Sequence, residues 1–199
     1  MKNARPYDRD VALDAAMTLF WEKGYYATSL KDLESALKMK PGSIYAAFNS
    51  KENLFQLVLE RYYERNKREL RASVEKVGSP LLALAEHLRA IGRAPSGDQP
   101  AKACMLVKTL LSMTAEDAGI AQAASQYMSG MENEMVAIFQ LAIKQGELPH
   151  DADVRQLAKR FQGDVTLLRI EAQRGIDPTE LNASAERLAQ RVLTLGQVS

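Results

Sequence analysis

The sequence predicts an all-α fold with about nine helices. Apolar residues recur at spacings of three and four along nearly the whole chain of 199 residues, and no alternating run of β-branched residues predicts a strand. With 46% hydrophobic residues, the chain can bury a sizeable core. Clusters of Gly, Pro, Ser and Asp interrupt the apolar pattern, which divides it into separate helices.

The first two predicted helices have recognisable start and stop residues. The first is expected from about Asp8, a favourable N-cap residue, to Lys23, with Gly24 as the stop. The second starts near Ser29, because the spacing from Ser29 to Asp32 matches a capping box. It is short, since its apolar pattern ends at Leu37.

The segment KPGSIYAAF predicts a third helix that is also short. Pro41 suits a first helical turn, and Ile44 and Phe48 lie four residues apart, which places both on one buried face. Ser50 follows as the N-cap of a long fourth helix that extends to about Lys76.

Five further helices are expected after the break at Gly78-Ser79-Pro80. They cover about residues 81–91, 102–113, 119–145, 153–174 and 179–195. We therefore predict two domains: residues 1–52, joined by the helix 53–76 to a larger domain at 77–199.

Composition narrows the classes of protein. The net charge is only +1, from 26 basic and 25 acidic residues, but residues 1–76 hold 14 Lys and Arg against 11 Asp and Glu. A single cysteine, Cys104, excludes an internal disulfide framework. No apolar run approaches the ~18 residues of a membrane helix, so we expect a cytoplasmic protein that does not contact a membrane.

Three short helices within the first 48 residues, the last two joined by a tight turn, are typical of a helix-turn-helix unit. In such a unit the second helix of the pair enters the major groove of DNA with its N-terminal residues. Gly42 would let the backbone approach DNA, Lys40 and Ser43 offer a charge and a hydroxyl, and Tyr45 can reach a phosphate. The basic excess at this end of the chain is consistent with this interpretation.

The stretch AMTLFWEKGYYATSLKDLESALKMKPGSIYAAFNSKENLFQLVLERY resembles the amino-terminal module of the tetracycline-repressor (TetR) family of bacterial transcription regulators. The resemblance rests on the Phe-x-x-x-Gly-Tyr turn, the Thr-Ser helix start, the Ser-Ile-Tyr-x-x-Phe core and the Lys-Glu-x-Leu entry to the fourth helix. It implies a homodimeric repressor that binds palindromic double-stranded operator DNA and has an effector pocket in its carboxy-terminal domain.

By position, the resemblance implies a set of DNA contacts and shows one departure from the family pattern. Lys38 stands where the family usually has a glycine. Either a non-glycine residue closes this turn in the left-handed conformation, at a cost of about 1 kcal/mol, or the turn is tightened in a different way. The implied contacts are Thr28, Ser29, Lys31, Lys40, Gly42, Ser43, Tyr45, Asn49 and Lys51.

Soft side chains concentrate in the middle helices and suggest a pocket for a small, largely apolar effector. Methionine adapts to irregular voids, although a methionine stripe at helical spacing is also common in an ordinary core. The candidate effector-binding residues are Cys104, Met105, Met128, Met131, Met135 and Phe139.

The last two helices each carry an apolar seam and are candidates for a four-helix bundle with a second subunit. The alternative is that both seams pack inside one subunit. The candidate dimerisation residues are Phe161, Val165, Leu168, Leu181, Leu188 and Val192.

Other functions lack support in the residues. The only histidines are His87 and His150, and we find no nucleophile elbow, phosphate-binding loop or His-Glu-x-x-His helix, so we expect no enzyme activity, metal or cofactor. The alternative to a DNA-binding regulator is a helical adaptor or small-ligand-binding protein that does not bind DNA.

Overall fold

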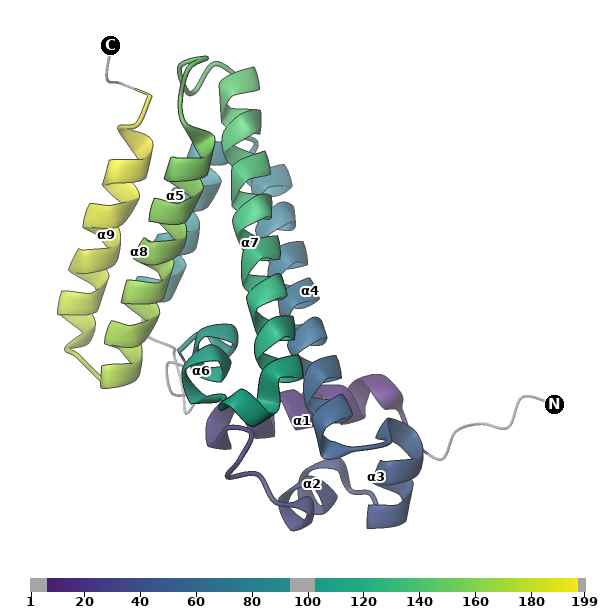
Figure 1. Cartoon of the computed structure of the whole chain (residues 1–199). Coiled ribbons are helices and arrows are strands. Elements are labelled where there is room, and N and C mark those ends of the chain that lie inside the picture. The colour runs from purple at the N-terminus through teal and green to yellow at the C-terminus, as the bar shows by residue number, and fades with distance from the viewer. Residues whose placement is uncertain (1–6, 94–102, 197–199) are drawn as a thin grey trace. The chain divides into compact units, whose positions relative to one another are not determined.

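The structure is a computed structural model that describes residues 7–93 and 103–196. All regular secondary structure in these residues is helical, which confirms the predicted fold class (Figure 1). The elements are α1 (Arg9–Lys23), α2 (Leu30–Leu37), α3 (Pro41–Phe48), α4 (Lys51–Val77), α5 (Pro80–Gly92), α6 (Met105–Ser112), the short 3-10 helix η1 (Ala115–Asp117), α7 (Ala118–Lys144), α8 (Val154–Arg174) and α9 (Pro178–Leu193).

The chain forms two compact units. The first contains the described residues up to Glu64 together with Met105–Tyr127. The second contains the described residues from Arg65 to Cys104, and those from Met128 onward. The long helices α4 and α7 each contribute residues to both units.

The first unit is built around aromatic side chains. Phe20 of α1 and Phe55 of α4 meet edge to face with their ring centroids 4.9 Å apart, and both are almost fully buried. The caps predicted for α1 are present, because the Asp8 carboxylate accepts hydrogen bonds from the first turn and Gly24 ends the helix with a φ of 84°. A residue with a side chain would be strained at that φ, so Gly24 fits this position.

The second unit packs α5 against α8 and α9, and α8 and α9 lie side by side in opposite directions (Figure 1). Its core also takes Phe139 and its neighbours from α7. Where α5 crosses α9, a Cβ atom on Gly92 would overlap Ala185. Glycine is therefore required for the close approach of these two helices.

One helix is shorter in the structure than the sequence predicted. The helix expected at about 102–113 is the eight-residue α6, and η1 separates it from α7. Thr114 and Asp117 form a capping box around η1, since the Thr114 amide and hydroxyl both donate to the Asp117 carboxylate. In the part of the chain that the structure describes, no helix has both the length and the hydropathy needed to cross a membrane.

Candidate nucleic-acid interface

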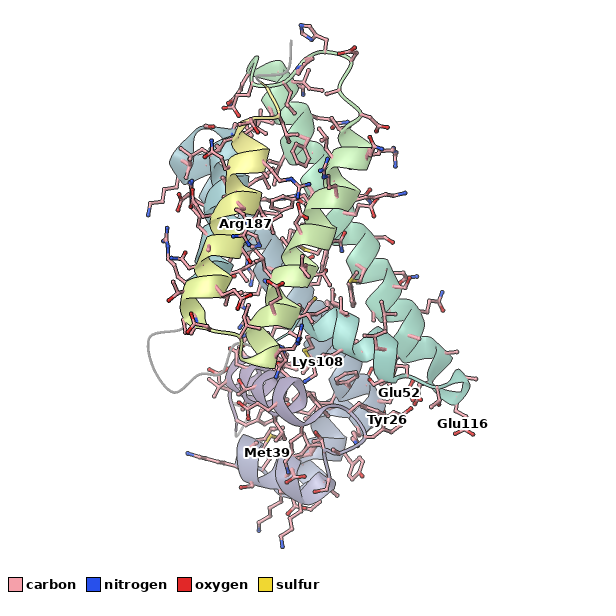
Figure 2. The ribbon with its side chains drawn as sticks, turned by 90° about the vertical axis from the view of Figure 1, so that its left-hand side faces the viewer. Tyr26, Met39, Glu52, Lys108, Glu116 and Arg187 are labelled. Carbon is pink, nitrogen blue, oxygen red and sulfur yellow. The ribbon has the colours of Figure 1, made fainter. Side chains whose placement is uncertain are left out.

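The turn between α2 and α3 is closed by Lys38 in the left-handed conformation, with φ 54° and ψ 39°. Of the two alternatives for the turn that lacks the family glycine, the structure therefore has the left-handed residue. The Lys38 amide donates to the carbonyl of Glu34, which satisfies a carbonyl at the end of α2. Met39, directly after it, is buried and anchors the turn (Figure 2 labels this residue).

The start of α2 is held by the predicted capping box. The Ser29 hydroxyl accepts from the Asp32 amide at 3.2 Å, and the Asp32 carboxylate accepts from the Ser29 amide at 2.8 Å. The same carboxylate also pairs with Lys23 of α1, whose Nζ lies 2.6 Å from Asp32 Oδ1. The hydrogen bond from Lys23, followed by those from Ser29, holds the pKa of Asp32 well below its usual range. One exposed carboxylate therefore joins α1 to the start of α2.

One face of α3 is buried and the other faces outward. Ile44 and Phe48 are almost fully buried, as their spacing predicted. The opposite face and the N-terminal turn expose a basic, hydroxyl-bearing surface at Lys40, Gly42, Ser43 and Tyr45. Nothing lies within 4 Å of a Cβ built on Gly42, so an external backbone can approach there.

Asn49 ends α3 with a φ of 63° and is exposed. Asparagine tolerates positive φ better than most residues with a side chain, which suits it to this position. Ser50 then caps α4, because its hydroxyl accepts from the Asn53 amide at 3.0 Å. Both residues lie between α3 and α4, where the sequence predicted a very short connection.

Thr28 requires a correction to the predicted set of contact residues. It is fully buried, and its hydroxyl donates to the Gly24 carbonyl at 2.7 Å. A side chain without exposed surface does not reach a phosphate. Thr28 instead closes the loop between α1 and α2, and Ser29 and Lys31 remain the exposed candidates at the start of α2.

Lys51 lies at the first residue of α4, but its ammonium is not simply solvated. Its Nζ lies 4.6 Å from the centroid of the Tyr25 ring, a cation–π geometry. Burial lowers the pKa of Lys51, although the charge of Asp32 opposes this effect. The helix end and the aromatic ring thus fix the position of this positive charge.

A contact that the sequence did not reveal lies beside this module. The Tyr26 hydroxyl donates to the Asp117 carboxylate and lies 3.4 Å from the Thr114 hydroxyl. It holds the pKa of Asp117 below its usual value. Figure 2 shows Tyr26 beside Glu116, the residue that precedes Asp117. Because 91 positions separate Tyr26 from Asp117, no local pattern could have indicated the contact.

The predicted effector-binding residues are spread over the two units: Met105 belongs to the first, and the other five belong to the second. Met105 lines a cavity of about 330 Å³ in the first unit, and Phe139 lines a cavity of about 390 Å³ in the second. Met135 is buried in the core of the second unit, and Met128 and Met131 are half-buried. Cys104, also half-buried, immediately precedes α6.

The predicted dimerisation residues all lie inside the subunit. The seam of α9 packs against α5, so the structure gives these side chains the intramolecular role that was the alternative. On the other side of α8, Leu167 and Ile170 are 49% and 41% exposed. The buried residues are Phe161, Val165, Leu168, Leu181, Leu188 and Val192.

The two histidines do not form a site with the other candidate ligands. His150 is exposed, and the ring of His87 packs 6.3 Å from that of Phe161. Within residues 7–93 and 103–196, no three His, Cys, Asp or Glu side chains lie close enough together to hold a metal ion.

A short capped helix, a tight turn and a second short helix with an exposed basic end define a helix-turn-helix DNA-binding protein. The comparisons with known proteins agree. The family described as bacterial regulatory proteins, tetR family, matches residues 12–58, and the tetracyclin repressor-like C-terminal domain matches residues 80–186. The chain therefore belongs to the tetR family and is a DNA-binding transcriptional regulator.

Relatives match over nearly the full length. The HTH-type transcriptional repressor ComR of Escherichia coli K12 is 34% identical, over 92% of this chain and 85% of ComR. A cysteine mutant of the TetR family regulator CifR, complexed with 26bp double-strand operator DNA, is 31% identical with a TM-score of 0.82, covering 96% of this chain and 98% of CifR. A tetR family regulator from Cytophaga hutchinsonii, 21% identical over 92% of each chain with a TM-score of 0.79, shares the fold.

Proposed function

We propose that this protein is a repressor that binds a palindromic operator as a homodimer and leaves it when a small, largely apolar effector binds. The observation that carries the proposal is the exposed, basic N-terminal end of α3, supported from beneath by the buried Ile44 and Phe48. The structure of the 31% identical CifR mutant with operator DNA supports the same use of the fold. The protein would act in the cytoplasm by binding alone, without catalysing a reaction.

The proposed DNA contacts divide into two kinds. Lys40, Gly42, Ser43 and Tyr45 lie on or beside the first turn of α3, the part that enters the major groove in a helix-turn-helix protein. Lys31 on α2 is placed to reach a base edge beside this turn. Ser29 before α2, Asn49 after α3 and Lys51 on α4 surround it and are suited to phosphates.

The homodimer would form through the outer faces of α8 and α9. On α8 the exposed residues Arg160, Gly163, Leu167 and Ile170 recur at spacings of three and four, so they share one face. Nothing lies within 4 Å of a Cβ built on Gly163, which leaves room for a helix of a second copy. A pair of helices from each subunit then makes a four-helix bundle.

The division of labour follows the predicted domains. Residues 1–52 would read DNA, residues 77–199 would dimerise and respond to the effector, and the helix 53–76 would join them. The two DNA-binding domains of a dimer must lie about 34–36 Å apart to enter successive major grooves. A small change in the distance between these domains is therefore enough to release the operator. The predicted effector residues of α7, Met128, Met131 and Met135, are suited to apolar ligands because methionine adapts its shape.

The experiment is an electrophoretic mobility shift with the DNA upstream of the protein's own coding sequence, followed by in vitro transcription from that DNA. We expect a complex that survives competition by scrambled DNA, and lower transcript yield when the protein is present. Binding without a loss of transcript would contradict repression. No complex with any duplex would favour the adaptor or ligand-binding alternative.

A further inference from the structure

A cavity of about 330 Å³ lies within the first unit, between the end of α1, the start of α4 and helix α6. Its volume is at the lower end of the range of ~300–1,000 Å³ in which small-molecule sites fall. Figure 2 shows Lys108, one of its lining residues, where α6 lies beside α1. The cavity is lined by Phe20, Trp21, Lys23, Gly24, Tyr25, Phe55, Met105, Lys108, Thr109, Leu111 and Ser112.

Aromatic side chains form much of the cavity wall. Phe20, Tyr25 and Phe55 contact one another, with ring centroids 4.9–6.4 Å apart. Met105 adds a polarizable thioether and is almost fully buried. Flat apolar walls of this kind favour an aromatic ring or a compact hydrocarbon over a hydrated polar molecule.

The charges in the cavity are of one sign. Lys23 and Lys108 both line it, whereas no Asp or Glu is among the lining residues described above. Lys108 Nζ donates to the Trp21 carbonyl at 2.7 Å, which places this ammonium against the wall formed by α1. The ammonium can donate three hydrogen bonds, so the one to Trp21 leaves capacity for a ligand oxygen. Ser112 adds a hydroxyl at the exposed end of α6.

The larger cavity in the second unit does not have these properties. It is lined by Asp164 together with Arg160 and Arg191, so its charged groups include both signs. Arg160 also belongs to the outer face of α8, which we propose contacts the partner subunit. The smaller cavity therefore has the clearer preference for one class of ligand.

We propose that the cavity between α1, α4 and α6 binds a small aromatic carboxylate. The ring would lie against Phe20, Tyr25 and Phe55, and the carboxylate would accept hydrogen bonds from Lys108 and Lys23. Hydrogen bonds between an ammonium and a carboxylate are stronger than those between neutral groups, so the charge of the ligand decides its affinity.

Lys23 connects the cavity to the DNA-binding surface. Its Nζ pairs with Asp32, and the same carboxylate completes the capping box with Ser29 at the start of α2. A ligand carboxylate that draws Lys23 away leaves Asp32 with only its Ser29 partners, which loosens the junction of α1 and α2. This regulatory consequence rests on the proposed function, whereas ligand binding itself does not.

Binding can be measured without DNA because Trp21 is the only tryptophan of the chain and lines the cavity. Phenylacetate, phenylacetamide and phenethylamine, which differ mainly in charge, are titrated into the full-length protein while Trp21 fluorescence is recorded. We expect phenylacetate to cause a saturable change in Trp21 fluorescence. Its affinity should be about tenfold or more above that of phenylacetamide. Equal responses to all three probes, or none, would overturn the proposal.

Variants separate the charge from the cavity itself. Lys108→Met should weaken phenylacetate binding by about tenfold, and Lys108→Arg should restore most of it. Lys144→Met removes an exposed lysine at the end of α7 that does not line the cavity, and should change nothing. Ser112→Phe fills the exposed side of the cavity and should abolish binding. Wild-type affinity in both Lys108→Met and Ser112→Phe would contradict the site.

The coupling is tested last, with the wild-type protein on its operator. Phenylacetate should release the DNA, and Lys23→Met, which lacks the pair to Asp32, should bind the operator more weakly even without ligand. Binding of phenylacetate without release would overturn the coupling through Lys23. Failure to bind any operator would count against the proposed function and leaves the fluorescence result to decide the ligand site.

Discussion

The guanidinium of Arg61 on α4 donates two hydrogen bonds to the carboxylate of Asp14 on α1, each 2.7 Å long. A third hydrogen bond, 2.8 Å long, runs from Arg61 to Asp10, one turn earlier on α1. Hydrogen bonding to the two carboxylates, Asp14 first, raises the pKa of Arg61, so the side chain stays charged at any pH at which the protein is folded. This pairing fastens α1 to the long helix α4. Helix α1 is the first helix of the DNA-binding residues 1–52, which we call the reading module.

Arg61→Met is expected to lower the free energy of unfolding by about 1 kcal/mol, because methionine keeps the length of the side chain but loses the paired charge. The value is modest since Arg61 and both aspartates keep exposed surface. Arg61→Lys retains the charge without the planar two-bond geometry. Its free energy of unfolding should therefore lie between those of the wild type and Arg61→Met. Urea unfolding measures all three, and identical midpoints would show that the pairing adds no stability.

The two lysines at the edge of the reading module should respond differently to substitution. Lys31 is exposed on α2, and the family resemblance aligns it with a position that reaches a base edge. Lys31→Ala should therefore weaken the free energy of operator binding by about 1–3 kcal/mol. It should also relax the sequence preference at one base pair per half-site. Lys51→Ala should weaken binding to all DNA alike and lower the salt slope by about 1 for each phosphate that is no longer neutralised.

A salt series with operator and scrambled DNA distinguishes the two roles. Because Lys51 also lies over the Tyr25 ring, its loss should destabilise the fold by about 0.5–1 kcal/mol, and binding must be measured well below the unfolding temperature. If Lys31→Ala weakens both DNAs equally, Lys31 contacts only phosphate. Base reading then rests on Lys40, Ser43 and their neighbours on α3.

The dimer interface is tested best on the exposed side of α8. The double change Leu167→Glu with Ile170→Glu should produce a folded monomer in sedimentation, since both side chains are exposed within one subunit. Leu188→Asp is a poorer test, because Leu188 is buried in the subunit's own core and a buried carboxylate would unfold it. Leu82→Glu, at an exposed leucine of α5, is the matched control. A dimer that persists in the α8 variant contradicts the assignment.

His87 should make stability depend on pH. Burial, and then the charge of Arg169, lower the pKa of His87 from 6.5 to about 4, so the folded state favours the neutral ring. The contribution of the neutral His87 ring to stability is fully present above pH 6.5. It is lost as the pH falls toward 4, because the unfolded chain takes up the proton first. As the residue keeps some exposed surface, we expect a loss of about 1–2 kcal/mol between pH 7 and pH 5.

Urea unfolding of the wild type and of His87→Leu at the two pH values isolates this effect. Carboxylates elsewhere titrate equally in both proteins, so their contribution cancels in the comparison. The leucine variant should lose less stability on acidification. An equal loss in both would mean that His87 is protonated as readily in the folded state as in the unfolded one.

Local chemistry in the sequence predicted most of the reading module. The Asp8 cap, the Ser29 capping box and the left-handed Lys38 each depend on residues within a few positions of one another, and the structure contains all three. The buried pair Ile44 and Phe48 follows from helical spacing alone. These features are readable because the atoms involved belong to the same turn or helix.

Contacts between distant segments were not predictable in this way. Thr28 is the example within the site: Ser and Thr at a helix start suit DNA contact, but the fold turns its hydroxyl inward to Gly24. An apolar seam such as that of α9 shows that a face is covered, not which helix covers it. The pairs of Tyr26 with Asp117 and Lys108 with Trp21 likewise depend on how α6 and η1 lie beside α1 and the loop that follows it.

The most direct measurement of DNA reading by α3 is a hydroxyl-radical footprint on the DNA upstream of the coding sequence, with the wild type and with a Ser43→Ala, Tyr45→Ala double variant. We expect two protected half-sites related by two-fold symmetry, their centres one helical turn or a multiple of it apart. The double variant, which alters only exposed side chains of α3, should stay folded and lose this protection. A single asymmetric footprint, or one that the double variant retains, would contradict reading by a pair of α3 helices.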